Sequence, residues 1–234
     1  MLQRIRTVIN YAAAKDYDPG LDSELWGHLK IALGANDKAR KVEHHKSCPY
    51  PEVRELLAKV KGSTASALTK LALELAVLTA SRSGEVRGAC WAEFDENFES
   101  WIIPGKRMKS GREHRIPLSS RAAVLLKQAR ALHNGNGPLV FPTNKNTQLS
   151  DMVFTQLMKR LELPFTPHGF RSSFRTWGME STSYPDEMLE FALAHVVGDQ
   201  TVRAYARSDM VAKRRQLMQD WADFLGKPDV KTAA

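Results

Sequence analysis

The hydrophobic periodicity of this chain changes from helical to strand-like and back again, and this change constrains its fold more than any other feature. Leucines recur at positions 68, 71, 75 and 78, the spacing of one buried face of a helix. Residues 100–104 (SWIIP) and 113–118 (EHRIPL) then read as strands around a Lys-Ser-Gly turn, which predicts a β-hairpin. Because helical segments follow, we expect an α+β protein that is mainly α with one small antiparallel sheet.

Cap residues and helix breakers indicate where the other helices begin and end. Thr166-Pro167 is the strongest start signal, because a hydroxyl can cap the helix and proline fits its first position. We expect that helix to carry His168 to Trp177 and to stop at Gly178. The other expected helices are residues 1–14, one from Glu52, one from Ser119 or Ser120 to Leu132, one from Ser150 or Asp151 to Leu161, 185–195 and 209–225.

Composition excludes several classes of protein. The 234 residues are 43% hydrophobic and 26% charged, as in ordinary globular domains, and they contain no apolar run long enough to cross a bilayer. The two cysteines, Cys48 and Cys90, cannot form a disulfide framework, which favours a reducing compartment. The sequence also lacks a signal peptide and the C-x-x-C, H-E-x-x-H, G-x-S-x-G and Walker motifs. We therefore expect a cytoplasmic protein that uses no membrane, metal or nucleotide cofactor.

The positive charge of the chain is concentrated in three segments. The formal net charge is +8, yet residues 106–115 and 203–215 each carry a local +4, and Arg171 and Arg175 add two more charges. A single segment of this kind is commonly just a solvated surface. Three of them, each on an expected hairpin or helix, favour a polyanionic partner such as nucleic acid.

Polar residues on the expected helices are spaced so that they share faces. Arg82 and Glu85 lie three residues apart, as do His168 and Arg171. The second pair also stands near a helix N-terminus, where free amide groups and the positive end of the dipole attract an anion. Arginine suits a phosphodiester because its planar fork donates two hydrogen bonds. Each pair also fits a purely structural role, such as a buried ion pair or a helix cap.

Tyr205 is the nucleophile that this pattern favours. It lies between Arg203 and Arg207, and nearby cations favour the ionised phenol, which is otherwise about one part in a thousand at pH 7. Tyr184 is a rival, but it precedes Pro185 in an expected loop and has no flanking arginines. Considered alone, Tyr205 also fits a half-buried residue of a helix.

The order of these residues resembles that of the tyrosine recombinases, above all the integrases of temperate phages and genomic islands. The matching motifs are T-x-x-R-x-x-E from Thr79 to Glu85, Lys109 followed by R-I-P-L, H-x-x-R from His168 to Arg171, Ala194-His195, and Tyr205. The resemblance covers residues 51–234, the catalytic domain of that family with its DNA breaking and rejoining fold. Residues 1–50 look like the end of a core-binding domain and a linker, so the chain resembles a fragment whose upstream part is missing.

The resemblance implies a reaction at a DNA phosphodiester. Tyr205 would attack the phosphorus, giving a 3′-phosphotyrosine and a free 5′-hydroxyl, while Arg82 and Arg171 hold the non-bridging oxygens. A 5′-hydroxyl of another duplex would reverse the attack, so bond energy is conserved and neither a metal nor a nucleotide is needed. The implied function is site-specific recombination, the integration or excision of a mobile element.

The other matching residues would have supporting roles. Lys109 would protonate the leaving 5′-oxygen, His168 would assist proton transfer at the tyrosine, and His195 would donate a hydrogen bond to the phosphate. Glu85 would orient its neighbours. The remaining basic residues expected to bind DNA are Arg107, Arg112, Arg115, Arg175, Arg203 and Arg207.

The resemblance also implies partners. They are an attachment-site DNA duplex, further copies of the full-length protein in a homotetramer, an excisionase and a DNA-bending host factor, all in the bacterial cytoplasm at the nucleoid. Two other functions stay open: an inactive DNA-binding or regulatory fragment, and DNA relaxation like that of a type IB topoisomerase.

The sequence departs from the family pattern in two respects. Ala80 and Ala194 stand where glycine is usual, and Gly169-Phe170 replaces a frequent Asp-Leu. No catalytic group is removed, but the two alanines are expected to shift the local backbone slightly.

Overall fold

The structure of the chain is a computed structural model that describes residues 2–15, 17, 28, 47–133, 135, 137–195 and 210–226. The chain divides into two compact units, Met1–His44 and His45–Ala234. In the first unit, α1 (Leu2–Ala13) matches the expected N-terminal helix, and its apolar side chains Ile5, Val8 and Tyr11 are exposed. The predicted boundary between residues 50 and 51 stays a prediction.

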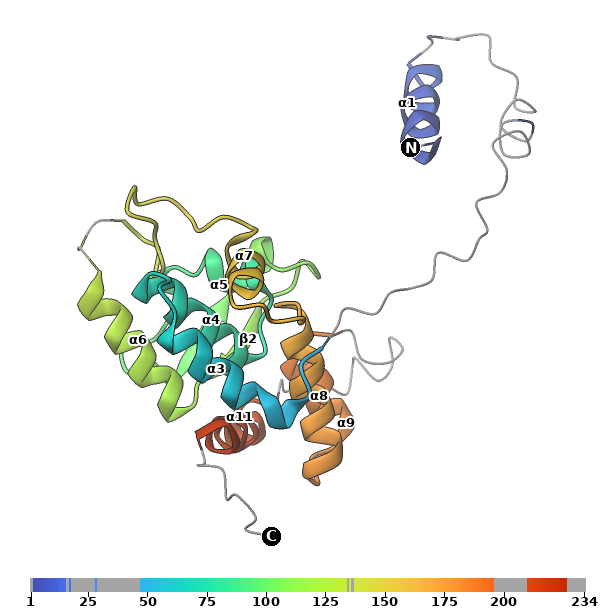
Figure 1. The fold of residues 1–234 in the computed structure, drawn as a ribbon. Coiled ribbons are helices and arrows are strands. Elements are labelled where there is room, and N and C mark those ends of the chain that lie inside the picture. The colour runs from blue at the N-terminus through green and yellow to red at the C-terminus, as the bar shows by residue number, and fades with distance from the viewer. Residues whose placement is uncertain are drawn as a thin grey trace. The chain divides into compact units, whose positions relative to one another are not determined.

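The second unit contains the remaining described elements. Besides three short 3-10 helices, they are, in chain order, α3 (Val53–Gly62), α4 (Ala67–Thr79), α5 (Ser83–Arg87), β1 (Ser100–Ile103), β2 (His114–Pro117), α6 (Ser120–Leu132), α7 (Val153–Arg160), α8 (Gly169–Ser181), α9 (Asp186–Ala192) and α11 (Val211–Gly226) (Figure 1). The two strands form an antiparallel sheet. The predicted class, mainly α with one small antiparallel sheet, is therefore confirmed.

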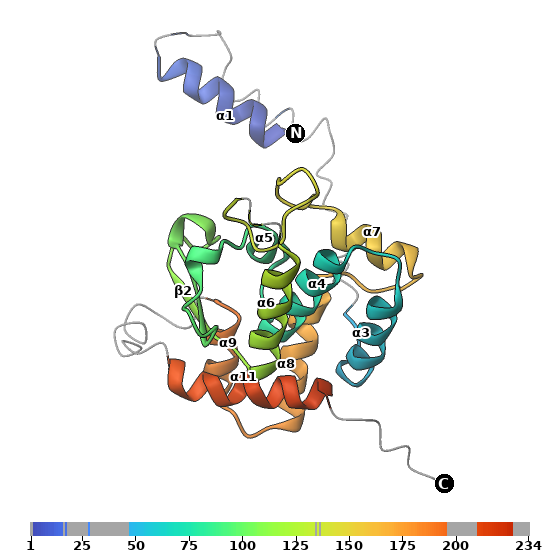
Figure 2. The same ribbon diagram turned by 90° about the vertical axis from the view of Figure 1, so that its left-hand side faces the viewer.

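Helix α4 forms the centre of the second unit. It contacts α3, α6, α8 and α11, which lie around it (Figures 1 and 2). The leucine spacing predicted one buried stripe, but Leu73 and Val77 outside that stripe are also fully buried, whereas Leu68 and Leu71 are only partly covered. Neighbours on several sides explain this difference, because a central helix buries most of its circumference.

The predicted hairpin is confirmed, with a longer connection than a tight turn. Ser100 pairs with Pro117 and Ile103 with His114. At the end of the loop, the Gly111 amide donates a hydrogen bond to the Met108 carbonyl at 3.0 Å. A Cβ atom on Gly105 would lie 2.5 Å from the Gly111 carbonyl oxygen, so the loop can close only with glycine at position 105.

Helix α8 begins and ends later than the sequence predicts. Thr166 Oγ1 accepts a hydrogen bond from the Gly169 amide at 3.2 Å, but the intervening residues form a turn, the N-cap is His168 and the helix starts at Gly169. The predicted end at Gly178 is wrong, because α8 continues to Ser181. A Cβ atom on Gly178 would overlap the Leu189 side chain of α9, so this glycine serves close packing of two helices that lie side by side (Figures 1 and 2).

An aromatic cluster attaches α11 to the core. Trp221 is fully buried, and its Nε1 donates a hydrogen bond to the Val77 carbonyl of α4 at 2.9 Å. The centroid of its ring lies 5.0 Å from the ring centroid of Trp177 on α8 and 5.7 Å from that of Phe224. Helix α11 therefore connects α4, which precedes Arg82, with α8, which carries Arg171.

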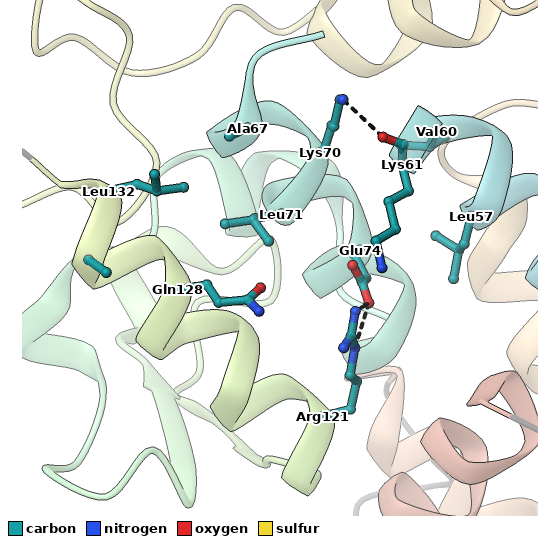
Figure 3. Close-up of a pocket in the computed structure, with 11 residues that line it drawn as sticks. Leu57, Val60, Lys61, Ala67, Lys70, Leu71, Glu74, Arg121, Gln128 and Leu132 are labelled. Carbon is teal, nitrogen blue, oxygen red and sulfur yellow. Dashed lines mark hydrogen bonds and ion pairs between the residues drawn. The ribbon is translucent and has the colours of Figure 1, made fainter. Parts of the chain in front are cut away.

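A cavity of about 430 Å³ opens between α3, α4 and α6 (Figure 3). Leu57, Leu71 and Leu132 are among its lining residues, and an ion pair between Arg121 and Glu74 at 2.6 Å crosses it. The predicted catalytic residues that the structure describes do not line it. Separately, no helix among the described residues is long and apolar enough to span a membrane.

Candidate functional site

The guanidinium of Arg171 joins the ends of two helices. Arg171 lies in the first turn of α8 and is 5% exposed. Its Nη1 donates a hydrogen bond to the Ala80 carbonyl at 2.5 Å, just beyond α4, and its Nη2 donates one to the Leu193 carbonyl at 2.6 Å, just beyond α9. Both acceptors belong to helix C-termini, where the dipole favours a cation. One side chain thus brings three helices to a single point.

Both of these helix ends have the same geometry. Ala80 and Ala194 have φ angles of 49° and 51°, in the left-handed region, and each is followed by an amide that bonds back into the helix. The Ser81 amide reaches the carbonyl of residue 76 at 3.2 Å, and the His195 amide reaches that of residue 190 at 3.0 Å. These are Schellman ends, which usually contain glycine. Ala80 and Ala194, which replace the usual glycines, therefore adopt a left-handed backbone that costs a residue with a Cβ atom about 1–2 kcal/mol.

Burial and neighbouring charge both act on Arg171. Burial, and after it the nearby Arg82 charge, lower its pKa, Glu85 and Glu190 oppose the shift, and the resulting pKa is about 10. Because that pKa stays well above neutrality, the guanidinium is positively charged at pH 7. A second, closely placed arginine makes the site strongly attractive to an anion.

Arg82 is held by the Glu85 carboxylate at the start of α5. The Arg82 amide donates to Glu85 Oε2 and its Nη1 donates to Glu85 Oε1, both at 2.8 Å. The carboxylate is nearly buried, whereas the Arg82 side chain is 26% exposed. The predicted placement of these two residues on one side of a turn is confirmed, and part of the Arg82 fork faces solvent.

His195 stands at the exposed edge of this group. Its Nε2 lies 3.2 Å from Nη2 of Arg171, and its Nδ1 lies 2.6 Å from Oε2 of Glu190. A guanidinium can only donate hydrogen bonds, so Nε2 accepts and Nδ1 carries the hydrogen. Arg82, Glu85, Arg171 and His195, all selected from the sequence, therefore meet in one place.

The other predicted catalytic residues are more dispersed. Lys109 is exposed in the Met108–Gly111 turn of the hairpin, and His168 is exposed at the N-cap of α8. Both side chains are therefore accessible from solvent. Tyr205, with the predicted DNA-binding residues Arg203 and Arg207, lies outside the described residues.

The rival tyrosine is disfavoured by its surroundings. The Tyr184 hydroxyl donates a hydrogen bond to Asp220 Oδ2 at 2.6 Å. Burial, that hydrogen bond and the Asp220 charge raise the pKa of Tyr184 to about 12. A phenol that ionises less readily than usual is a poor nucleophile.

The four described arginines that were expected to bind DNA differ in their surroundings. Arg112 and Arg115 are exposed on the hairpin. Arg107 instead pairs with the Glu93 carboxylate and donates to the Glu85 carbonyl at 2.5 Å. Arg175 on α8 pairs with Glu190 at 2.5 Å. The guanidinium groups of Arg107 and Arg175 are thus paired within the protein, although the Arg175 side chain is still 40% exposed.

Sequence reasoning missed one buried histidine beside the arginines. His114 on β2 is 9% exposed, and burial lowers its pKa to about 4, helped by the charges of Arg214, Arg171 and Arg82 against a hydrogen bond with the Ala192 backbone. Its only sequence signal was strand alternation, since His114 and Ile116 point inward while Arg115 points outward. Within the described residues, no group of three His, Cys, Asp or Glu side chains is placed to hold a metal ion.

Comparison with known proteins finds one family and several curated relatives of that family. Residues 49–211 match the model of the phage integrase family. The integrase of Enterobacteria phage P4 is 30% identical over 242 residues, covering 95% of this chain and 53% of that protein. The prophage integrase IntA of Escherichia coli (strain K12) is 32% identical over 182 residues, covering 76% and 44%. The chain thus spans about half the length of these curated relatives.

Solved structures share the fold. A lambda integrase (75-356) dimer bound to a COC′ core site matches with a TM-score of 0.54 and 19% identity, covering 89% of this chain and 80% of that one. A lambda integrase tetramer bound to a Holliday junction matches with a TM-score of 0.55 and 18% identity, covering 86% and 65%. At these identities the likeness shows the fold, which is that of the integrase catalytic domain.

Proposed function

The chain belongs to the phage integrase family, and from this premise we propose that it cleaves and rejoins DNA as the catalytic part of a tyrosine-type site-specific recombinase. The observation that carries this proposal is the meeting of Arg82, Arg171 and His195. Two arginines and a histidine, drawn from separate elements, are gathered beside two helix ends and partly open to solvent at Arg82 and His195. Such a group suits a phosphodiester better than a neutral ligand.

The arginines keep donors for a phosphate. A guanidinium has five N–H groups, and the bonds of Arg171 to Ala80, Leu193 and His195 occupy three of them. The rest, with the exposed part of the Arg82 fork, are available to the non-bridging oxygens. Because the arginines are fixed by protein contacts before DNA arrives, they need little reorganisation as charge develops in the transition state.

The proposed reaction uses these groups together with Tyr205, Lys109 and His168. The Tyr205 oxygen forms a bond to phosphorus and its proton passes to His168, while the bond from phosphorus to the 5′-oxygen breaks and Lys109 supplies the proton to that oxygen. The product is a 3′-phosphotyrosine. Attack by a 5′-hydroxyl from another duplex runs the same steps in reverse, so no metal or nucleotide cofactor enters.

The whole protein's partners are part of the proposal. They are an attachment-site duplex, a tetramer on two duplexes, an excisionase and a DNA-bending host factor, with the bacterial nucleoid as the location. The lambda integrase tetramer on a Holliday junction supports the tetramer. Arg112 and Arg115 are exposed on the hairpin, so their guanidinium groups are accessible to a DNA backbone.

A nicked suicide duplex from one end of the mobile element tests the activity. Loss of the short strand beyond the nick traps the cleaved state, so we expect a protein–DNA adduct that survives denaturant. If the chain binds the duplex but gives no adduct, it is a DNA-binding fragment and the cleavage proposal is wrong. Relaxation of supercoiled plasmid without strand exchange would instead favour the topoisomerase-like reaction.

A further inference from the structure

Side-chain contacts connect Arg175 on α8 with residues at the end of α9, and these in turn contact Arg171 on α8. Arg175 Nε donates a hydrogen bond to Glu190 Oε1 at 2.5 Å, and Glu190 Oε2 lies 2.6 Å from His195 Nδ1. His195 Nε2 in turn lies 3.2 Å from Arg171 Nη2. Arg171 and Arg175 are four residues apart on one helix, so they face α9 from the same side. Glu190 and Arg175 have no assigned part in the reaction.

The two carboxylate oxygens of Glu190 are each engaged by a different donor. Burial alone would raise the pKa of Glu190, but hydrogen bonds from Arg175 and His195 lower it overall, so the carboxylate is ionised. Its Oε2 accepts the hydrogen bond that His195 Nδ1 donates. Without it, the imidazole has no fixed partner at Nδ1 and can rotate or change tautomer.

The tautomer of His195 in the DNA-free protein determines how its ring can bind a phosphate. Nε2 accepts a hydrogen bond from Arg171 and therefore carries no hydrogen. A phosphodiester oxygen can only accept, so Nε2 must gain a proton before it can donate to DNA. The resulting imidazolium, with hydrogens on both nitrogens, is compensated by the Glu190 carboxylate at 2.6 Å.

We propose that Glu190, held in place by Arg175, is a positioning residue that fixes the His195 ring and allows Nε2 to take up one proton from solvent when a phosphodiester binds. This inference rests on the proposed function for its DNA ligand. His195 contacts Arg171 and Glu190. The further charged or titratable groups that act on these partners or on Arg175 are Arg82, Glu85, Asp186 and His114, and His114 in turn lies near Arg214.

Ring-nitrogen NMR of His195 tests the inference without DNA. At slightly alkaline pH, we expect the wild-type ring to carry its hydrogen on Nδ1. The probe is inorganic sulfate, which has only acceptor oxygens and does not titrate near neutrality. We expect sulfate to produce a second ring N–H on His195, identified by its absence in His195→Ala.

The variant Glu190→Gln separates positioning from simple helix packing. An amide has one acceptor oxygen and cannot serve both Arg175 and His195, so we expect the sulfate response to need at least tenfold more sulfate, a ratio that corresponds to about 1.4 kcal/mol. Glu187→Gln is the matched control, because it removes the same charge from an exposed position of α9 and should respond like the wild type. If Glu190→Gln does not fold, Arg175→Ala should weaken the same response.

Two results would overturn the inference. One is a wild-type ring that carries its hydrogen on Nε2 in the absence of sulfate. The other is a folded Glu190→Gln protein, or Arg175→Ala in its place, whose response equals that of the wild type. On the suicide duplex we expect Glu190→Gln to cleave roughly 10- to 100-fold more slowly, as for loss of a hydrogen bond to a charged group. If no protein forms an adduct, the proposed function fails, whereas the sulfate experiment still decides the role of Glu190.

Discussion

Arg171 donates a hydrogen bond to the carbonyl oxygen of Ala80 at 2.5 Å, across 91 positions of sequence. Ala80 has a φ angle of 49° and directly precedes the Ser81-Arg82 step into α5. The same guanidinium holds Leu193, two residues before His195. The backbone positions of Arg82 and His195 therefore depend on one buried side chain, which couples the stability of the fold to the geometry of the site.

Replacing Arg171 should reduce both stability and cleavage. Arg171→Lys keeps the positive charge but cannot hold two carbonyls with one ammonium in the same geometry. We expect the free energy of unfolding to fall by about 3 kcal/mol, since each buried carbonyl left without a partner costs roughly 1–3 kcal/mol. Arg171→Ala should cost on the order of 10²–10³ in cleavage rate. Urea unfolding and single-turnover cleavage measure these effects, with the exposed Arg112→Lys as control. Unchanged cleavage by Arg171→Ala would show that Arg171 does not bind the phosphate.

The two left-handed alanines should respond differently to glycine. Both substitutions relieve the same backbone strain, but Ala80 is fully buried and Ala194 only partly, so Ala80→Gly removes a methyl group with more apolar packing around it. We expect Ala194→Gly to be the more stable variant, by up to about 0.8 kcal/mol, the value of one buried methylene. Paired urea denaturation of both variants measures the difference. Equal stabilities, or the reverse order, would show that apolar packing around the Ala80 methyl group does not decide the difference.

Acid should destabilise the protein through His114. Its pKa is lowered to about 4 in the folded state, against an ordinary value of 6.5, so the unfolded chain binds the proton more readily. The stability that neutral His114 contributes is present above pH 6.5 and is lost as pH falls towards 4, by at most about 3 kcal/mol. His114→Gln should flatten this part of the curve of unfolding free energy against pH. A variant curve parallel to that of the wild type would contradict the assignment.

The arginines expected to bind DNA should separate into two groups. Arg112 and Arg115 are exposed, so replacing either by alanine should reduce the steepness of log affinity against log salt by roughly 0.9 for each phosphate that is no longer neutralised. Arg107→Ala should instead lower the melting temperature, because Glu93 and the Glu85 carbonyl lose their partner. Fluorescence anisotropy across a salt series and thermal unfolding measure the two effects. An Arg107→Ala protein with normal stability and a reduced salt slope would reverse the grouping.

Local patterns in the sequence predicted the parts of the fold that depend on near neighbours. The leucine spacing located α4, the Lys-Ser-Gly turn located the hairpin, and the spacing of Arg82 and Glu85 anticipated their ion pair. The end of α8 was mispredicted because Gly178 faces Leu189 of another helix, and such a contact leaves no local signal.

Long-range contacts at the site were beyond sequence reasoning for the same reason. The bonds from Arg171 to Ala80 and Leu193 join segments that only the folded chain brings together. The pairing of Arg175 with Glu190 likewise joins residues of two different helices. His114 was hidden within a basic segment, where its inward position on β2 was the only clue.

Mapping the DNA-linked peptide tests the central claim most directly. After trapping on the suicide duplex, the adduct is digested with protease and nuclease, and the residue that carries the nucleotide remnant is identified by mass spectrometry. We predict a phosphotyrosine linkage at Tyr205, and no adduct with Tyr205→Phe. A linkage at Tyr184 or any other residue, or an adduct that persists in Tyr205→Phe, would contradict the assignment.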